Sequence, residues 1–144
     1  MLRALFAALL LLPLAFASAH AGATHRLALQ VSDNDPVKMN AALNVAANVS
    51  KYYSDNGDEV EIQIVAFNAG LHMLREDTSP VKQRLTSFKQ SMPNVSFKAC
   101  QNTIDAMSKT EGKDVPIVEN AEHVPAGVVT LIELAEKGWT IVRP

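Results

Sequence analysis

The chain of 144 residues has a single cysteine, Cys100, so no disulfide can form within it. Apolar packing must therefore hold the fold, and a domain of this length has room for a core. In an oxidising compartment an unpaired cysteine forms an intermolecular disulfide, acts as a reactive thiol, or lies buried and inert. The sequence leaves these three alternatives open.

Basic clusters, glycine-rich phosphate loops and internal repeats are also lacking. With a net charge of −2 and no basic cluster, we expect neither a nucleic-acid partner nor a membrane partner. No two of the four histidines have metal-ligand spacing within one helix, so we expect no metal site, and we expect no cofactor. The remaining candidate chemistry is that of the cysteine and of the polar loops.

No apolar run reaches the roughly 20 residues that span a bilayer, but a shorter one stands at the start of the chain. This run begins after a positively charged start and ends at Phe16, and small residues follow, with cleavage expected after Ala19 or Ala21. The pattern predicts a signal peptide at residues 1–21 and a single mature domain at residues 22–144. We therefore expect a periplasmic or secreted protein.

Strand and helix patterns alternate along the mature domain. Apolar alternation predicts strands near residues 26–31, 60–67, 95–100, 123–125 and 139–142, and helical spacing predicts helices near 36–55, 79–92, 103–107 and 128–137. The segment Val115 to Val118 fits either an extended piece or the end of a helix. Such alternation predicts βαβ units, and hence an α/β fold whose parallel sheet is covered on both faces.

Two of the predicted helices have well-marked ends. Asp35 as N-cap and Pro36 in the first turn begin one helix, and Asn56-Gly57 ends it. Ala126-Gly127 is expected to form a tight turn before the last helix, which Gly138 ends. The residues of the last helix that we expect to face inward are Val128, Leu131, Ile132 and Ala135.

Polar loops follow four of the predicted strands. Ligands bind at the carboxyl ends of the strands in a parallel sheet, so these loops should meet at one edge. One of them runs from Ser32 to Asp35, and the others supply the candidate ligand-binding residues. These are Asn68, Gly70, Asn102, Thr103, Pro125 and Gly127. The alternative for each is that it serves turn geometry alone.

Cys100 stands between a predicted strand and a predicted helix whose N-cap we expect at Asn102 or Thr103. Unpaired N–H groups and the helix dipole favour the thiolate there, so we expect a modestly lowered pKa for the thiol. Lys98, on the same strand face, would add to this effect, and Asp105 would oppose it. The alternative is a buried cysteine that acts only in packing.

Several motifs resemble the DsrE/DsrF-like family. They are Asp33-x-Asp35-Pro36-x-Lys38-Met39-Asn40, Asn68-x-Gly70-Leu71, Ala99-Cys100-x-Asn102-Thr103 and Val124-Pro125-Ala126-Gly127-Val128. The resemblance implies a three-layer α/β/α sandwich on a mostly parallel five-stranded sheet, assembled as a homo-oligomer, commonly a trimer or hexamer. It also implies that Cys100 carries sulfur as a persulfide, with a protein as sulfur donor or acceptor. Many members have a histidine in the loop matched by Asn68-Ala69-Gly70, whereas this chain has none there.

Two functions fit these observations. The first is an exported sulfur carrier or transfer protein in which Cys100 is the catalytic residue and the N–H groups of Asn102 and Thr103 stabilise the persulfide anion. The second is a non-catalytic oligomeric module that binds a small molecule at the same edge of the sheet, with Cys100 structural.

Overall fold

Five parallel strands form the centre of the structure, a computed structural model that describes residues 22–144. The strands are β1 (Thr24–Val31), β2 (Glu59–Ala66), β3 (Val95–Cys100), β4 (Ala121–Val124) and β5 (Thr140–Val142). The helices are α1 (Pro36–Asp55), the 3-10 helix η1 (Asn68–Leu74), α2 (Lys82–Ser91), α3 (Gln101–Glu111) and α4 (Gly127–Glu136). The predicted signal peptide lies outside the described residues. Within residues 22–144, no helix is both long and apolar enough to cross a membrane.

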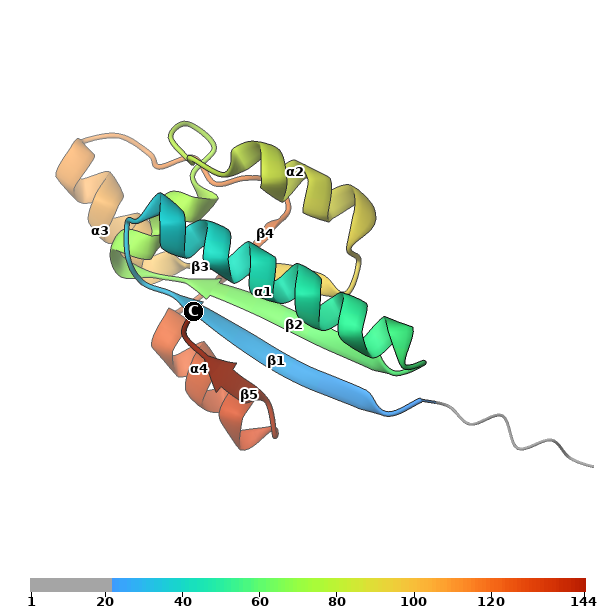
Figure 1. Cartoon of the computed structure of the whole chain (residues 1–144). Helices are drawn as coiled ribbons and strands as arrows, with labels where there is room; N and C mark the ends of the chain where they lie inside the picture. Colours follow the sequence, from blue (N-terminus) through green and yellow to red (C-terminus); the bar gives the residue numbers. More distant parts are fainter. Residues whose placement is uncertain (1–21) are drawn as a thin grey trace, which may run out of the picture.

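The sheet has the order β4-β3-β2-β1-β5, and every neighbouring pair is parallel. Helices α1 and α2 lie on one face and α4 on the other, while α3 projects beyond the carboxyl ends of the strands (Figure 1). This arrangement confirms the predicted α/β fold and is a three-layer α/β/α sandwich. The sheet is parallel throughout because each connection between consecutive strands returns the chain to the same end of the sheet. The connections contain α1, η1 with α2, α3 with the segment 112–120, and α4.

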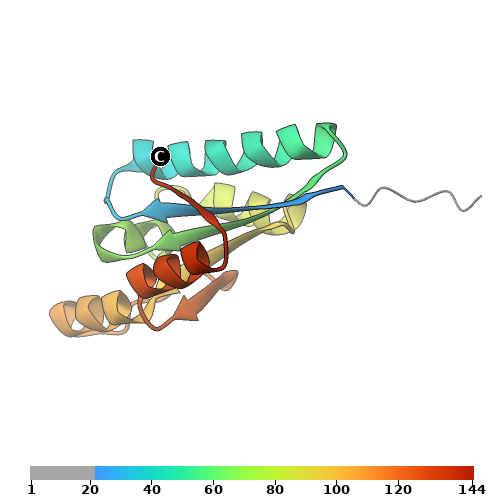
Figure 2. The ribbon, with the colours of Figure 1, turned by 90° about the horizontal axis from the view of Figure 1, so that it is seen from below.

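The two faces of the sheet are covered unequally. The larger core cluster joins β1, β2 and β3 to α1, η1 and α2. On the other face α4 alone crosses the strands, as Figure 2 shows from that side. The smaller core cluster there consists of Ala28, Val65, Phe67, Cys100, Leu131 and Leu134. Cys100 therefore belongs to the thinly covered face, close to solvent.

Helix α1 begins and ends where the sequence predicts. Asp35 is the N-cap, and its side chain accepts the N–H of Val37 at 2.8 Å. Pro36 occupies the first turn, where its missing N–H breaks no helical hydrogen bond. After the last turn, Gly57 has a φ of 78°, which glycine adopts without strain.

Other predicted boundaries were wrong. The N-cap of α3 is Cys100, two residues before the earliest position predicted, and α2 begins at Lys82, after Ser79-Pro80. The sequence left Val115 to Val118 undecided, and the structure shows it extended. Val118 donates its N–H to the carbonyl of Leu74 at 3.0 Å. This bond fixes the segment beside η1.

The predictions for α4 need two corrections. Ala126 and Gly127 form no tight turn, because Ala126 is the N-cap of α4 and Gly127 its first residue. Val128 and Ile132 are about half exposed, at 52% and 53%, and Ala135 is exposed as well, whereas Leu134 is buried instead. Thr130, Glu133 and Glu136 form a polar side of this helix, but the apolar arc opposite them is wider than the side that contacts the sheet, so the spacing does not determine which apolar residues are buried.

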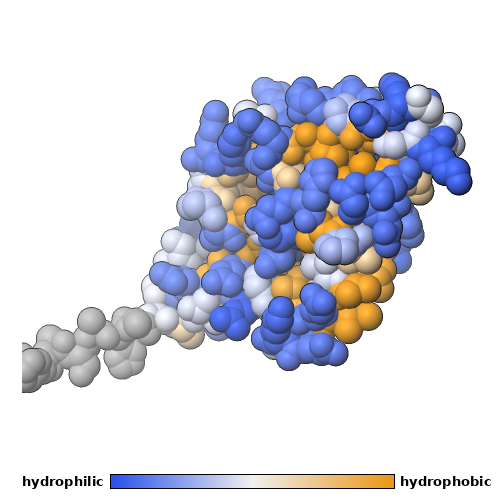
Figure 3. Space-filling view, turned by 180° about the vertical axis from the view of Figure 1, so that it is seen from behind, coloured by the Kyte–Doolittle hydropathy of each residue, from blue (hydrophilic) through white to orange (hydrophobic). Residues whose placement is uncertain are grey.

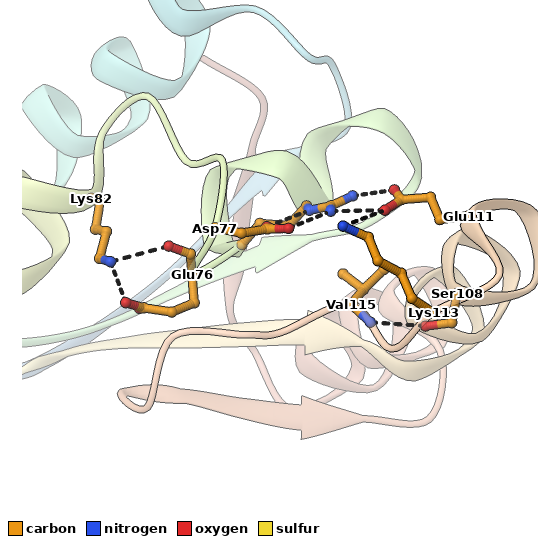
Figure 4. A network of polar contacts seen from close by, with 8 residues as sticks. Glu76, Asp77, Lys82, Ser108, Glu111, Lys113 and Val115 are labelled. Carbon is orange, nitrogen blue, oxygen red and sulfur yellow. Dashed lines mark hydrogen bonds and ion pairs between the residues drawn. The ribbon is translucent and has the colours of Figure 1, made fainter.

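A buried arginine joins η1 to the end of α3. Arg75 is 2% exposed, and its guanidinium donates to both Asp77 and Glu111 (Figure 4). The distances from Nε and Nη2 to the Asp77 carboxylate are 2.9 Å and 2.8 Å. Hydrogen bonding to Arg75 lowers the pKa of Asp77 to about 2. The cluster fixes the C-terminal end of α3, which forms one wall of the site described next.

Candidate functional site

A cavity of about 580 Å³ opens at the carboxyl ends of β2 and β3, between α3 and the start of α4. Five of the predicted site residues line it: Asn68, Cys100, Asn102, Thr103 and Gly127. They come from three separate parts of the chain. The rule that ligands bind at the carboxyl ends of parallel strands therefore predicted the meeting of these residues correctly.

Two of the predicted residues do not line the cavity. Gly70 is buried, and a Cβ there would lie 2.3 Å from the carbonyl oxygen of Val31, so it serves close packing against β1. Pro125 accepts the N–H of Asn102 through its carbonyl at 3.3 Å, and this bond ties the start of α3 to the loop before α4. Both residues hold segments next to the cavity in place without lining it themselves.

The loop Ser32 to Asp35 is also absent from the cavity lining. Its Asp33 is bonded to Lys38 at 2.9 Å and to Arg143 at 2.8 Å. Both hydrogen bonds lower the pKa of the Asp33 carboxyl, and the bond from Arg143 has the larger effect. The loop therefore ties the C-terminus to the start of α1.

One wall of the cavity, formed by α3, was not predicted from the sequence. Met107, Thr110 and Glu111 line the cavity together with Thr103. Positions 103, 107 and 110 repeat at helical spacing and therefore lie on one face of α3. That spacing is visible in the sequence, but it identifies a cavity wall only once the helix is known to project beyond the sheet.

Cys100 is 5% exposed and meets the cavity at the N-termini of two helices. Burial by itself would raise the pKa of the thiol. Hydrogen bonds from the Thr103 hydroxyl and from the backbone N–H of Gly127 outweigh it, with smaller contributions from the N–H groups of Thr103 and Asn102. The pKa of Cys100 therefore lies below its ordinary value. Neither helix has a side-chain cap bond, so the N–H groups of Gly127 and Thr103 are available to the sulfur, whereas the N–H of Asn102 is shared with the carbonyl of Pro125.

Thr103 is oriented by the loop that follows β2. Its hydroxyl oxygen accepts the backbone N–H of Asn68 at 3.0 Å, which leaves its own proton free to be donated to the sulfur of Cys100. Asn68 has a φ of 49°, a left-handed conformation that asparagine adopts more readily than most residues. The N–H of Asn68 therefore orients the Thr103 hydroxyl so that its proton is donated to the sulfur of Cys100.

Gly127 lets the start of α4 approach the thiol closely. A Cβ at this position would lie 2.9 Å from both Cβ and Cδ1 of Phe67, whose ring lines the cavity beside Cys100. Any larger residue would push the first turn of α4 away from Phe67. The N–H of Gly127 would then move away from the sulfur.

No histidine lines the cavity among the residues described. His123 pairs in register with Ala99, so it leaves the sheet on the face opposite Cys100, where its Nδ1 lies 2.8 Å from the amide oxygen of Gln101. Lys98 forms an ion pair with Glu122. Thiolate formation at Cys100 therefore depends on hydrogen-bond donors and helix termini.

Asp105, expected to oppose the thiolate, accepts a hydrogen bond from Gln101 at 2.7 Å. In the described part of the chain, no cluster of three or more His, Cys, Asp or Glu side chains is placed to hold a metal ion. The arrangement provides one nucleophilic sulfur that is favoured as an anion without a general base, facing a cavity large enough for a small molecule.

Replacement of Thr103 by valine should make the thiol less acidic. A hydrogen bond to a charged group is worth about 1.5–3 kcal/mol, so the thiolate fraction at neutral pH should fall by about tenfold or more. We expect the pH midpoint of iodoacetamide labelling to rise in Thr103→Val and to stay near that of the wild type in Thr103→Ser, which keeps the hydroxyl. Labelling of the wild type that is slow at every pH would show instead that Cys100 is structural.

Comparison with known proteins finds a similar solved structure but no matching family model. No protein-family model matches the chain. No curated protein matches it either. Among solved structures, the protein of unknown function MTH1491 from Methanobacterium thermoautotrophicum has a TM-score of 0.66 and 26% sequence identity, covering 83% of this chain and 99% of that one. The likeness extends over nearly the whole neighbouring chain and supports the α/β fold.

Proposed function

We propose that this protein is a DsrE/DsrF-like sulfur carrier that binds sulfane sulfur on Cys100 as a persulfide. The observation that supports this most strongly is the meeting of two helix N-termini at one thiol, beside an open cavity. The N–H groups and the Thr103 hydroxyl that favour the thiolate would equally favour the terminal anion of a persulfide. The motif Ala99-Cys100-x-Asn102-Thr103 gives independent support through its family resemblance.

The proposed cycle needs no base in the cavity. The Cys100 thiolate attacks a sulfane sulfur, and an acceptor thiolate later attacks the persulfide and regenerates Cys100. Stabilisation of the anionic sulfur by the two helix termini makes Cys100 both a ready acceptor and a good leaving group. The N-terminal pattern that resembles a signal peptide supports an exported site of action, periplasmic or secreted.

The direct test is the mass of the intact protein after incubation with benzenethiosulfonate, a sulfane-sulfur donor. We expect the wild-type protein to gain one sulfur atom that a reducing thiol removes, and Cys100→Ser to gain none. Circular dichroism of the serine variant checks that its fold is intact. If the folded wild-type protein gains no sulfur, Cys100 is not a sulfur carrier and the binding-module alternative gains support.

Self-association stays a prediction, and the exposed side of α4 provides a surface for it. Val128, Val129 and Ile132 are each about half exposed there, and Figure 3 shows apolar surface on this part of the molecule between polar side chains. We expect sedimentation at micromolar concentration to show oligomers, commonly trimers or hexamers in the family. Ile132→Lys should shift them toward monomer, because it places a charge in the apolar surface. Glu133→Lys, on the same helix, is the matched control, and a wild-type protein that is only monomeric would contradict the prediction.

A further inference from the structure

The cavity extends well beyond the space that one sulfur atom requires. Its volume of about 580 Å³ falls within the range of small-molecule sites. It follows α3 from Thr103 to Glu111, and a helix rises about 1.5 Å per residue, so this wall is roughly 12 Å long. An inorganic sulfur anion at Cys100 would fill only one end of it.

The described lining of the cavity is mostly apolar and has few charged side chains. Apolar side chains form much of its surface: Phe67, Ala106, Met107, Ala126 and Val128. Its described lining contains no lysine, arginine or histidine, and its one ionisable side chain besides Cys100 is Glu111. The Glu111 carboxylate is bonded to Arg75 outside the lining, and this contact lowers its pKa and keeps it ionised. The hydrogen-bond donors and helix termini that favour an anion therefore lie only at the end of the cavity next to Cys100.

We infer that the sulfur donor of this site is an organic sulfane-sulfur compound whose body is uncharged and apolar; this inference rests on the proposed persulfide function. Every such donor brings its transferable sulfur to the N–H groups at Cys100, so donors differ in what the rest of the molecule places along α3. An additional negative charge there would lie beside Met107 and Val128, with no cationic side chain in the lining to pair with it, because the Glu111 carboxylate already occupies Arg75. An apolar body would be in contact with apolar side chains instead.

The transfer step balances without an added oxidant. The Cys100 thiolate attacks the sulfane sulfur, a new sulfur–sulfur bond forms at Cys100, and the sulfur–sulfur bond of the donor breaks. The bonding electron pair leaves with the organic part, which departs as a sulfinate when the donor is a thiosulfonate. The product on the protein is the persulfide anion.

Three donors test the inference: benzenethiosulfonate, 4-carboxybenzenethiosulfonate and thiosulfate. The first two have closely similar leaving groups and differ by one carboxylate, and thiosulfate has no organic body. The rate of sulfur gain at Cys100 is measured by intact mass for the folded protein and for the protein unfolded in urea, which corrects for the intrinsic reactivity of each donor. We expect the ratio of folded to unfolded rates to be about tenfold higher for benzenethiosulfonate than for either of the other donors, a preference of about 1.4 kcal/mol.

A charge variant separates electrostatics from shape. Thr110→Lys places an ammonium group along α3 in the cavity and should shift the preference toward the carboxylated donor, whereas the uncharged Thr110→Gln should not. Folded-to-unfolded ratios that are equal for the three donors, or that favour thiosulfate, would overturn the inference while leaving persulfide formation intact. Absence of sulfur gain from all three donors would instead refute the proposed function.

Discussion

Replacement of Gly70 by alanine should lower the free energy of unfolding by about 3 kcal/mol or more, or prevent the folded state from accumulating. The added Cβ would lie 2.3 Å from the carbonyl oxygen of Val31, 2.5 Å from its carbonyl carbon and 2.7 Å from Cα of Ser32. Overpacking a core typically costs about 1–3 kcal/mol when side chains can move. These neighbours are backbone atoms at the end of β1, so the cost should lie at or above the upper end. Urea unfolding followed by circular dichroism measures it.

Two other glycines provide graded controls. Gly127→Ala meets only the side chain of Phe67, at 2.9 Å, so we expect a smaller loss of stability together with weaker thiolate formation at Cys100. Gly112→Ala meets nothing within 4 Å, and its cost should be only the roughly 1–2 kcal/mol of a left-handed φ. Equal stability of Gly70→Ala and Gly112→Ala would contradict the close approach of η1 to β1 at Gly70.

Replacement of Arg75 by methionine should lower the free energy of unfolding by about 3 kcal/mol, the lower end of the range for breaking a buried ion pair. The lower end applies because the Asp77 and Glu111 carboxylates keep 29% and 30% side-chain exposure and can be hydrated once the guanidinium is gone. The double variant Asp77→Asn with Glu111→Gln should cost more, about 5 kcal/mol, because it leaves the buried guanidinium without a counter-ion. Urea titrations of both variants test the order, and equal losses would contradict the burial of this arginine.

The same cluster predicts a pH dependence of stability. The pKa of Asp77 is lowered to about 2 in the folded protein, against about 4 in an unfolded chain. Its contribution is therefore fully present above about pH 4 and is lost as the pH falls toward 2. Arg75→Met should show a weaker loss of stability across this interval than the wild-type protein. An identical acid dependence in both proteins would exclude the pairing.

Local patterns in the sequence determined most elements of this fold. Helix α1 could be placed to the residue, because Asp35, Pro36 and Gly57 each have a conformational preference that acts within a few residues of the chain. Alternation of strands with helices then led to the parallel sheet, and the sheet brought Cys100 and Gly127 to one edge. These predictions needed only short-range preferences and the general geometry of βαβ units.

Tertiary structure alone decided what surrounds the cysteine. The pairing of Arg75 with Glu111 joins residues 36 positions apart, and nothing in the local sequence of either residue indicates the other. The inward side of α4 could not be predicted, because the apolar arc of the helix is wider than the side that contacts the sheet. The hydroxyl of Thr103 could be an N-cap by its sequence position, but the N–H of Asn68 turns it toward Cys100. Chain neighbours determine local conformation, whereas the charge, shape and hydrogen bonds of a cavity depend on contacts between segments that meet only in the folded protein.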